Sequence, residues 1–212
     1  MPSLANALAT FEQRVEESEQ VVSSVEALWQ TAPLHSNIRR QVAGPQLSAL
    51  YEMAYLSLFG HWENFIEECL IRMLVGQGSP SYRPVVARGP RARTLADARN
   101  RVLDGRRFQL WYDPVKSANR VGGHVGGSPL QNVLLTSQGQ IEHYAAVRHA
   151  IAHRSADAQT MFTAASMALA GVAHTSPGEF LRSQNHTDSL NPVRWIRVIS
   201  TDLRRLAVAS TS

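Results

Sequence analysis

Apolar side chains recur at helical spacing over long stretches of this sequence, and this periodicity decides the fold class. The broadest apolar stripe runs through residues 44–75, where large apolar side chains recur every three or four residues. A narrower stripe marks residues 3–30, and another marks residues 192–207. No run alternates β-branched and polar residues as a strand does. We therefore predict an all-α fold with segment 44–75 at its centre, because a domain buries its most apolar segment.

Breaker residues divide the rest of the chain into shorter elements. Further helices are predicted over 94–103, 137–153 and 156–170, with a turn at 176–178. Segment 76–93 is rich in Gly, Pro, Ser and Arg, and segment 114–136 holds four glycines around His124. Both segments are predicted to be flexible loops. The whole chain, residues 1–212, is predicted to form a single helical domain with a long first helix and an additional C-terminal helix.

Charge is distributed unevenly along the chain, although the net charge is only +4. The first thirty residues are acidic, whereas the stretch from Arg83 to Arg107 holds eight arginines against two aspartates. Lys116 is the only lysine among 21 basic side chains. A planar guanidinium group suits phosphate better than an ammonium group does, so this asymmetry indicates a polyanionic partner on one surface. A coding bias toward arginine is the alternative explanation.

A single cysteine, Cys69, excludes an internal disulfide and indicates a reducing compartment. It falls within the apolar pattern of segment 44–75, so we expect a core residue rather than a nucleophile. No apolar run approaches the ~20 residues that span a bilayer, and the N-terminus lacks the pattern of a secretory signal. We therefore expect a cytoplasmic protein without a membrane partner.

The segment from Ile141 to Arg154 carries the strongest indication of chemistry. On a helix, Arg148 lies in the middle of an apolar arc, and His149 and His153 gather with Glu142 on the neighbouring face. The apolar arc consists of Ile141, Tyr144, Ala145, Val147, Ile151 and Ala152. Burying an unpaired charge costs several kcal/mol, so Arg148 needs a partner. Either it pairs with a carboxylate, for which Glu63 is the best candidate, or it faces an anionic substrate.

A histidine beside such an arginine has a specific use near a phosphodiester. His153 can take a proton from an attacking 2′-hydroxyl group or give one to the leaving 5′-oxygen near neutral pH. Arg148 can stabilise the negative charge that grows on the phosphoryl oxygens. Such a pair needs no metal ion and no cofactor. It would cleave RNA and not DNA, because DNA lacks the internal nucleophile.

The stretch Arg148-His149-Ala150-Ile151-Ala152-His153 resembles the signature of HEPN ribonucleases, in which an arginine and a histidine are separated by a few residues. The polar residue after the arginine, here His149, is also typical. Its flanks look like the corresponding segment of bacterial RiboL-PSP-HEPN-type proteins. Segment 59–66, which contains Trp62 and Glu63, resembles their central helix. The resemblance spans roughly residues 45–170.

The resemblance implies an antiparallel helical bundle that forms a homodimer, in which two Arg/His motifs share one composite active site. It implies metal-independent cleavage of RNA that leaves a 2′,3′-cyclic phosphate and a 5′-hydroxyl group. Many relatives act as toxins or in phage defence under the control of an antitoxin or another partner protein. Relatives that are silenced by nucleotidyl transfer carry a tyrosine where this chain has Ser155, so we do not expect that regulation.

On this interpretation Arg148 holds the scissile phosphate and His153 performs acid–base chemistry. His149 orients one of them or contacts RNA, and Glu63 orders Arg148. The surface cations expected to guide the RNA are Arg83, Arg88, Arg91, Arg93 and Arg154.

Two rival interpretations remain open. His149 and His153 have the spacing of zinc ligands on one helix face, but Ala150 stands where a metalloprotease motif has its glutamate. Alternatively, the chain is a non-catalytic HEPN-like module that binds RNA or protein, or a regulatory subunit of a larger complex.

Overall fold

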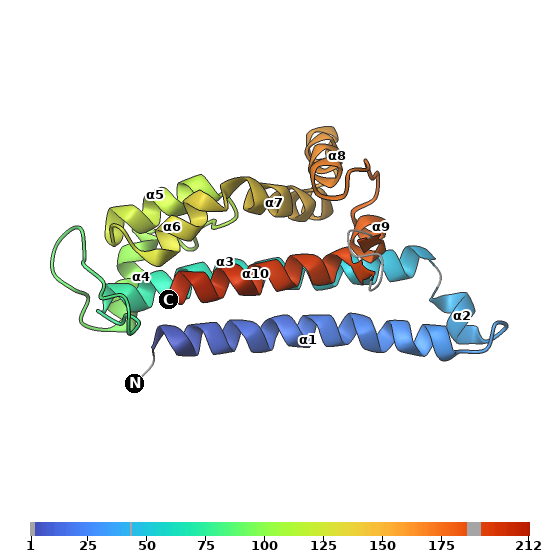
Figure 1. Cartoon of the computed structure of the whole chain (residues 1–212), viewed down its shortest axis with the longest axis horizontal. Coiled ribbons are helices and arrows are strands. Elements are labelled where there is room, and N and C mark those ends of the chain that lie inside the picture. Colours follow the sequence, from blue (N-terminus) through green and yellow to red (C-terminus); the bar gives the residue numbers. More distant parts are fainter. Residues whose placement is uncertain (1–2, 43, 186–191) are drawn as a thin grey trace. The chain divides into compact units, whose positions relative to one another are not determined.

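A computed structural model describes residues 3–42, 44–185 and 192–212, and the chain is mostly helical, as predicted (Figure 1). The helices are α1 (Leu4–Thr31), α2 (Asn37–Gln41), α3 (Gly44–Leu74), α4 (Leu95–Leu103), α5 (Pro114–His124), α6 (Pro129–Thr136), α7 (Gln138–Ala152), α8 (Ala156–Ala170), α9 (Pro177–Arg182) and α10 (Trp195–Thr211). A short antiparallel pair joins β1 (Gln184–Asn185) to β2 (Val193–Arg194).

The helices predicted over 3–30, 44–75, 94–103, 137–153 and 156–170 are confirmed to within one residue at each end, because local signals mark their boundaries. The Thr94 side chain accepts a hydrogen bond from the Asp97 N–H and caps α4, and Ser155 caps α8 in the same way through Ala158. Gly171, with φ at 70°, ends α8 in the left-handed conformation that glycine adopts without strain. The connection between α3 and α4 contains no helix, as predicted for segment 76–93.

The prediction of a flexible loop over 114–136 is wrong, because α5 and α6 occupy this segment. Asp113 caps α5 by accepting a hydrogen bond from the Lys116 N–H, and Pro114 occupies the first turn. Gly122 lies inside α5, and a Cβ atom there would collide with the side chain of Gln131. The glycine thus permits close packing of α5 on α6, rather than flexibility.

Smaller corrections concern the C-terminal part of the chain. The turn predicted at 176–178 is the start of α9, which Ser176 caps. The helix predicted over 192–207 begins later, at Trp195, because β2 precedes it. It also continues farther than predicted, to Thr211. The two-residue strands were not predicted, and neither was α2. Such short elements are too brief to show a periodicity.

The chain divides into two compact units. The first comprises Met1–Gln13, His61–Glu142 and Leu203–Ser212, and the second comprises Arg14–Gly60 and His143–Asp202. The prediction of one domain over 1–212 stays a prediction, as does the HEPN-like arrangement of the helices. Within the described residues, every helix is too short or too polar to cross a membrane.

The first unit has an aromatic core. Phe11 of α1 contacts Trp62 and Phe65 of α3, with ring centroids 6.1 and 5.1 Å apart. All three side chains are buried, and each buried ring of this size contributes ~1.5–3 kcal/mol. In the same unit Trp111 donates a hydrogen bond of 2.9 Å from Nε1 to Glu67 Oε2, which ties the segment before α5 to α3.

The second unit holds α7 in place through two tyrosines. Tyr55 of α3 is fully buried and donates its hydroxyl hydrogen to the carbonyl oxygen of Tyr144, at 2.9 Å. The Tyr144 hydroxyl group donates in turn to Asp202 Oδ2 of α10, at 2.7 Å. Since a buried hydroxyl group without a partner is costly, these bonds fix the position of α7 against α3 and α10.

Candidate active site at the end of helix α7

The guanidinium group predicted to bind phosphate, that of Arg148, belongs to the last two turns of α7. Arg148 is half-buried, and most of the apolar arc predicted around it is buried, namely Ile141, Tyr144, Ala145 and Val147. The arc opens toward the helix end, because Ile151 is half-buried and Ala152 is exposed. Arg148 thus stands where α7 passes from core to solvent.

Two imidazole rings lie side by side at this helix end. The ring centroids of His149 and His153 are 4.7 Å apart and the rings are tilted by 52°. The prediction that both side chains share one face is therefore confirmed. His153 lies one residue beyond α7, and its backbone N–H still donates to the His149 carbonyl oxygen, at 2.8 Å. The His153 side chain is exposed, so solvent and a substrate reach it.

The connection from α7 to α8 is only three residues long, and it presents His153 and Arg154 to solvent. Ser155 completes this connection and caps α8 with its side chain. The capping bond fixes where α8 begins, so the short connection has little freedom. Arg148, His149 and His153 are thereby held on one short stretch of backbone.

Glu63, predicted to order Arg148, lies on α3 and is half-buried. It belongs to the first unit, whereas Arg148 belongs to the second. The pairing of Glu63 with Arg148 therefore stays a prediction. The question of whether Arg148 serves a carboxylate or a substrate stays open with it.

The arginines predicted to guide RNA separate into two groups. Those of the 76–93 connection are all exposed in the first unit, and Arg154 is exposed in the second. Arg91 packs against Gly76 and donates a hydrogen bond of 3.3 Å to the Pro84 carbonyl oxygen. The group consists of Arg83, Arg88, Arg91 and Arg93. Their exposure leaves their charges open to solvent and to a polyanion.

The described residues contain no group of three or more His, Cys, Asp or Glu side chains arranged to hold a metal ion. His149 and His153 are accordingly a pair of imidazoles without a third such ligand beside them in that part of the chain. The pair can still exchange protons with a substrate, which is the chemistry that the sequence predicts for His153.

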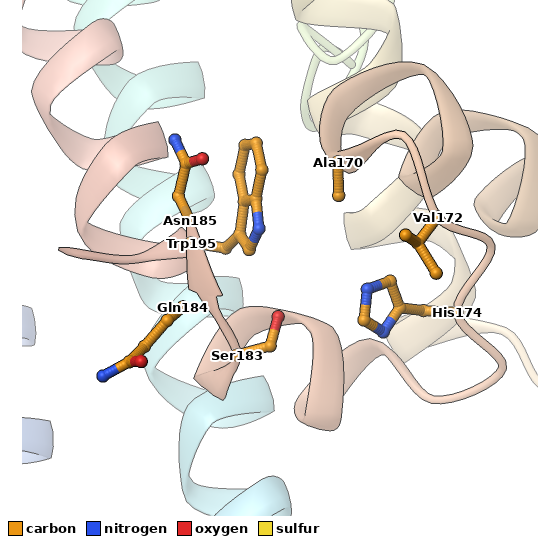
Figure 2. Close-up of a pocket in the computed structure, with 7 residues that line it drawn as sticks. All are labelled: Ala170, Val172, His174, Ser183, Gln184, Asn185 and Trp195. Carbon is orange, nitrogen blue, oxygen red and sulfur yellow. The ribbon is translucent and has the colours of Figure 1, made fainter. Parts of the chain in front are cut away.

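A separate cavity of about 410 Å³ lies in the second unit, between the end of α8 and the start of α10 (Figure 2). Trp195 and Asn185 line one side, and Val172 and His174 line the other. Ser183 Oγ donates a hydrogen bond of 2.7 Å to the Phe180 carbonyl oxygen. His174 is the only titratable side chain among the described residues that line this cavity. With its serine engaged by backbone, the cavity offers no activated nucleophile.

Sequence reasoning missed a second cluster of cations, in the first unit around the start of α5. Arg106, Phe108, Lys116 and Arg120 line a common cavity there. The signal was present, because Lys116, Arg120 and His124 recur every four residues and so share one helix face. It went unrecognised because segment 114–136 was interpreted as a loop.

Comparisons of the chain with models of protein families, with curated proteins and with solved structures find no match. The candidate site therefore depends on the geometry of the chain's own residues.

Proposed function

We propose that this protein is a metal-independent endoribonuclease whose active site lies at the end of α7. The observation that carries the proposal is the contact between the rings of His149 and His153, 4.7 Å apart, directly after the half-buried Arg148. One cation and two imidazoles on one short stretch supply the charge and the proton transfer that cleavage of a phosphodiester requires.

In the proposed reaction Arg148 donates hydrogen bonds to the non-bridging oxygens of the scissile phosphate. His153 takes the proton from the ribose 2′-hydroxyl group as this oxygen attacks phosphorus. The bond from phosphorus to the 5′-oxygen breaks, and the leaving oxygen receives the proton that the His153 imidazolium now carries. The products are a 2′,3′-cyclic phosphate and a 5′-hydroxyl group, so no water, metal or cofactor is consumed in this step.

The role of His149 follows from its place beside His153. Its ring limits the rotamers that the exposed His153 ring can adopt, and it can contact the RNA itself. Removing one of two touching imidazoles leaves the other less ordered. We therefore assign His149 a positioning role and expect a smaller loss of activity from its removal than from that of His153.

We further propose that two copies of the chain form a homodimer and bring two such helix ends to one composite cleft. Support comes from the exposure of His153 and Arg154 in the connection after α7, which leaves them accessible to a second copy. The exposed arginines of the 76–93 connection then guide the RNA backbone. Their contribution falls as salt rises, since bound phosphates release counterions. A toxin or defence effector in the cytoplasm, restrained by an antitoxin or another partner protein, would use such an activity.

The experiment compares RNA cleavage by wild type, Arg148→Ala and His153→Ala in the presence of EDTA. Loss of general acid–base catalysis slows a reaction by about 10²–10⁴-fold, and loss of a charge-stabilising donor slows it by about 10²–10³-fold. The control is His35→Ala, which removes an exposed histidine between α1 and α2, and it is expected to cleave at the wild-type rate. Wild-type cleavage by folded Arg148→Ala or His153→Ala would refute the proposal.

A second candidate function is a non-catalytic module that binds RNA or protein. The observation in its favour is a set of large apolar side chains exposed around the end of α1 and α2, namely Leu28, Leu34 and Ile38. Such side chains are typical of surfaces that dock a partner. This candidate predicts that the protein binds RNA or a partner protein, and that wild type and every variant above fail to cleave RNA.

A further inference from the structure

The Arg106–Arg120 cavity is a hollow of about 510 Å³ in the first unit, between the segment that precedes α5 and the first turns of that helix. Its volume lies in the range of sites that bind small organic molecules, ~300–1,000 Å³. Its lining includes Arg106, Arg107, Phe108, Leu110, Lys116 and Arg120. They combine positive charge with exposed apolar surface.

Positive charge dominates this cavity. Two arginines precede the helix, and Lys116 and Arg120 belong to it. Among the described residues that line the cavity, Asp113 is the only carboxylate. Asp113 is already engaged, because it caps α5 and lies 3.1 Å from the Lys116 ammonium group. Burial alone would raise the pKa of Asp113, but the hydrogen bonds from Lys116 lower it, so the carboxylate stays ionised and neutralises this one cation.

The arginines of the cavity lack such compensation. In the described part of the chain, no carboxylate lies within ion-pair distance of Arg106, Arg107 or Arg120. Arg120 is half-buried, stacks over the Trp111 ring at 5.1 Å and donates a hydrogen bond of 3.3 Å to the Leu110 carbonyl oxygen. Burial, and then the charge of Arg106, lower the pKa of Arg120. An anion placed between Arg106 and Arg120 would offset both effects, because its negative charge favours the charged form of both guanidinium groups.

Apolar surface lies next to these cations. The Phe108 side chain is 68% exposed and Leu110 is 50% exposed, although both line the cavity. An exposed phenyl ring beside guanidinium groups is the combination that proteins use to bind single-stranded nucleic acid, since each base has a face to stack and each phosphate a charge to pair. Folding gives no reason for Phe108 to be exposed, because burying it would stabilise the chain.

We propose that the Arg106–Arg120 cavity binds one nucleotide of single-stranded RNA, with a backbone phosphate between Arg106 and Arg120 and the base on the Phe108 ring. This inference deepens the proposed function, because it gives the RNA a second point of attachment in the unit that lacks Arg148. Arg88 extends the positive charge beyond the cavity, since burial and then the charges of Arg120 and Arg88 lower the pKa of the neighbouring His124.

The test is the affinity for an RNA that cannot be cleaved, a fluorescent 2′-O-methyl oligonucleotide of about ten residues, measured by anisotropy at several salt concentrations. Phe108→Ala is expected to weaken binding about tenfold, because one base loses its stacking partner. Arg106→Gln is expected to reduce the slope of log K against log salt by about 0.7, the value for one phosphate contact on a single strand.

Matched controls separate this site from general charge and apolar effects. Arg197→Gln removes an exposed arginine from α10, and Met53→Ala removes an exposed apolar side chain from α3. Both are expected to bind as wild type does. An otherwise identical oligonucleotide without bases should bind wild type and Phe108→Ala equally, because the stacking contribution is then already absent.

Three results would overturn the proposal. One is wild-type affinity of both Phe108→Ala and Arg106→Gln. Another is an equal loss of affinity by Phe108→Ala for the oligonucleotides with and without bases. The third is binding of polyglutamate as tightly as RNA, with the same dependence on Phe108, which would assign the cavity to an acidic peptide. Arg148 and His153 are intact in every variant and the RNA is uncleavable, so none of these results bears on the nuclease proposal.

Discussion

Removing the Tyr144 hydroxyl group tests how firmly the structure holds the helix that carries the candidate site. Tyr144 is 1% exposed, and its hydroxyl group donates a 2.7 Å hydrogen bond to the Asp202 carboxylate. A hydrogen bond to a charged group contributes ~1.5–3 kcal/mol to the free energy of unfolding. Tyr144→Phe is therefore expected to raise the unfolding equilibrium constant roughly 10- to 150-fold.

Tyr55→Phe is the matched comparison, because it removes a buried hydroxyl group of α3 that also holds α7 at Tyr144. Its acceptor is the uncharged carbonyl oxygen of Tyr144, which also accepts a hydrogen bond within α7 from the Arg148 N–H. The expected cost is about 1 kcal/mol, lower than that of Tyr144→Phe.

Urea unfolding followed by circular dichroism measures both costs, with an unchanged m value as the sign that the same surface is exposed. The reasoning is refuted if Tyr55→Phe costs more than Tyr144→Phe, or if Tyr144→Phe costs less than about 0.5 kcal/mol. Either result would mean that the bond to Asp202 does not stabilise α7 as its geometry indicates.

Three further predictions follow from single sites. Gly178→Ala places a Cβ atom against the backbone of Ser48 and should destabilise the chain by ~1–3 kcal/mol. Gly60→Ala places its Cβ atom in open space on α3 and should stabilise the chain by up to ~1 kcal/mol. Urea unfolding of both variants checks that the two changes in the free energy of unfolding have opposite signs. Burial raises the pKa of the Cys69 thiol, so a thiol reagent at neutral pH should label denatured but not native protein; rapid labelling of native protein would contradict this. Burial lowers the pKa of His124 below its ordinary 6.5, so the unfolded chain binds the proton more tightly and the free energy of unfolding falls as pH drops below 6.5. His124→Gln should remove part of this loss of stability, and an unchanged dependence of stability on pH in this variant would contradict the prediction.

The sequence was sufficient to predict the long helices because their signals are local. Three local features mark helix boundaries that no distant contact overrides. They are the apolar stripe of residues 44–75, the Thr94 cap of α4 and Gly171 at the end of α8. The interpretation of 114–136 failed because glycine has two uses. At Gly122 it allows close approach of Gln131 rather than a flexible backbone, and only the packing of α5 on α6 distinguishes the two.

The candidate site likewise contains features that the sequence predicts and features that it does not. The contact between His149 and His153 follows from a spacing of four residues on one helix, and the sequence predicted it. The Arg106–Arg120 cavity depends on how the segment before α5 folds back on that helix, which no periodicity encodes. A partner for Arg148 likewise depends on contacts between distant segments, so Glu63 stays a prediction.

The most direct test of the central claim is end-group mapping of RNA cut by the purified protein in EDTA. The proposed roles of Arg148 and His153 predict new ends that carry a 2′,3′-cyclic phosphate and a 5′-hydroxyl group, and no cut where the preceding ribose is 2′-O-methylated. Products with 5′-phosphate ends, cuts at methylated positions, or the same products from a folded double variant lacking Arg148 and His153 would contradict it.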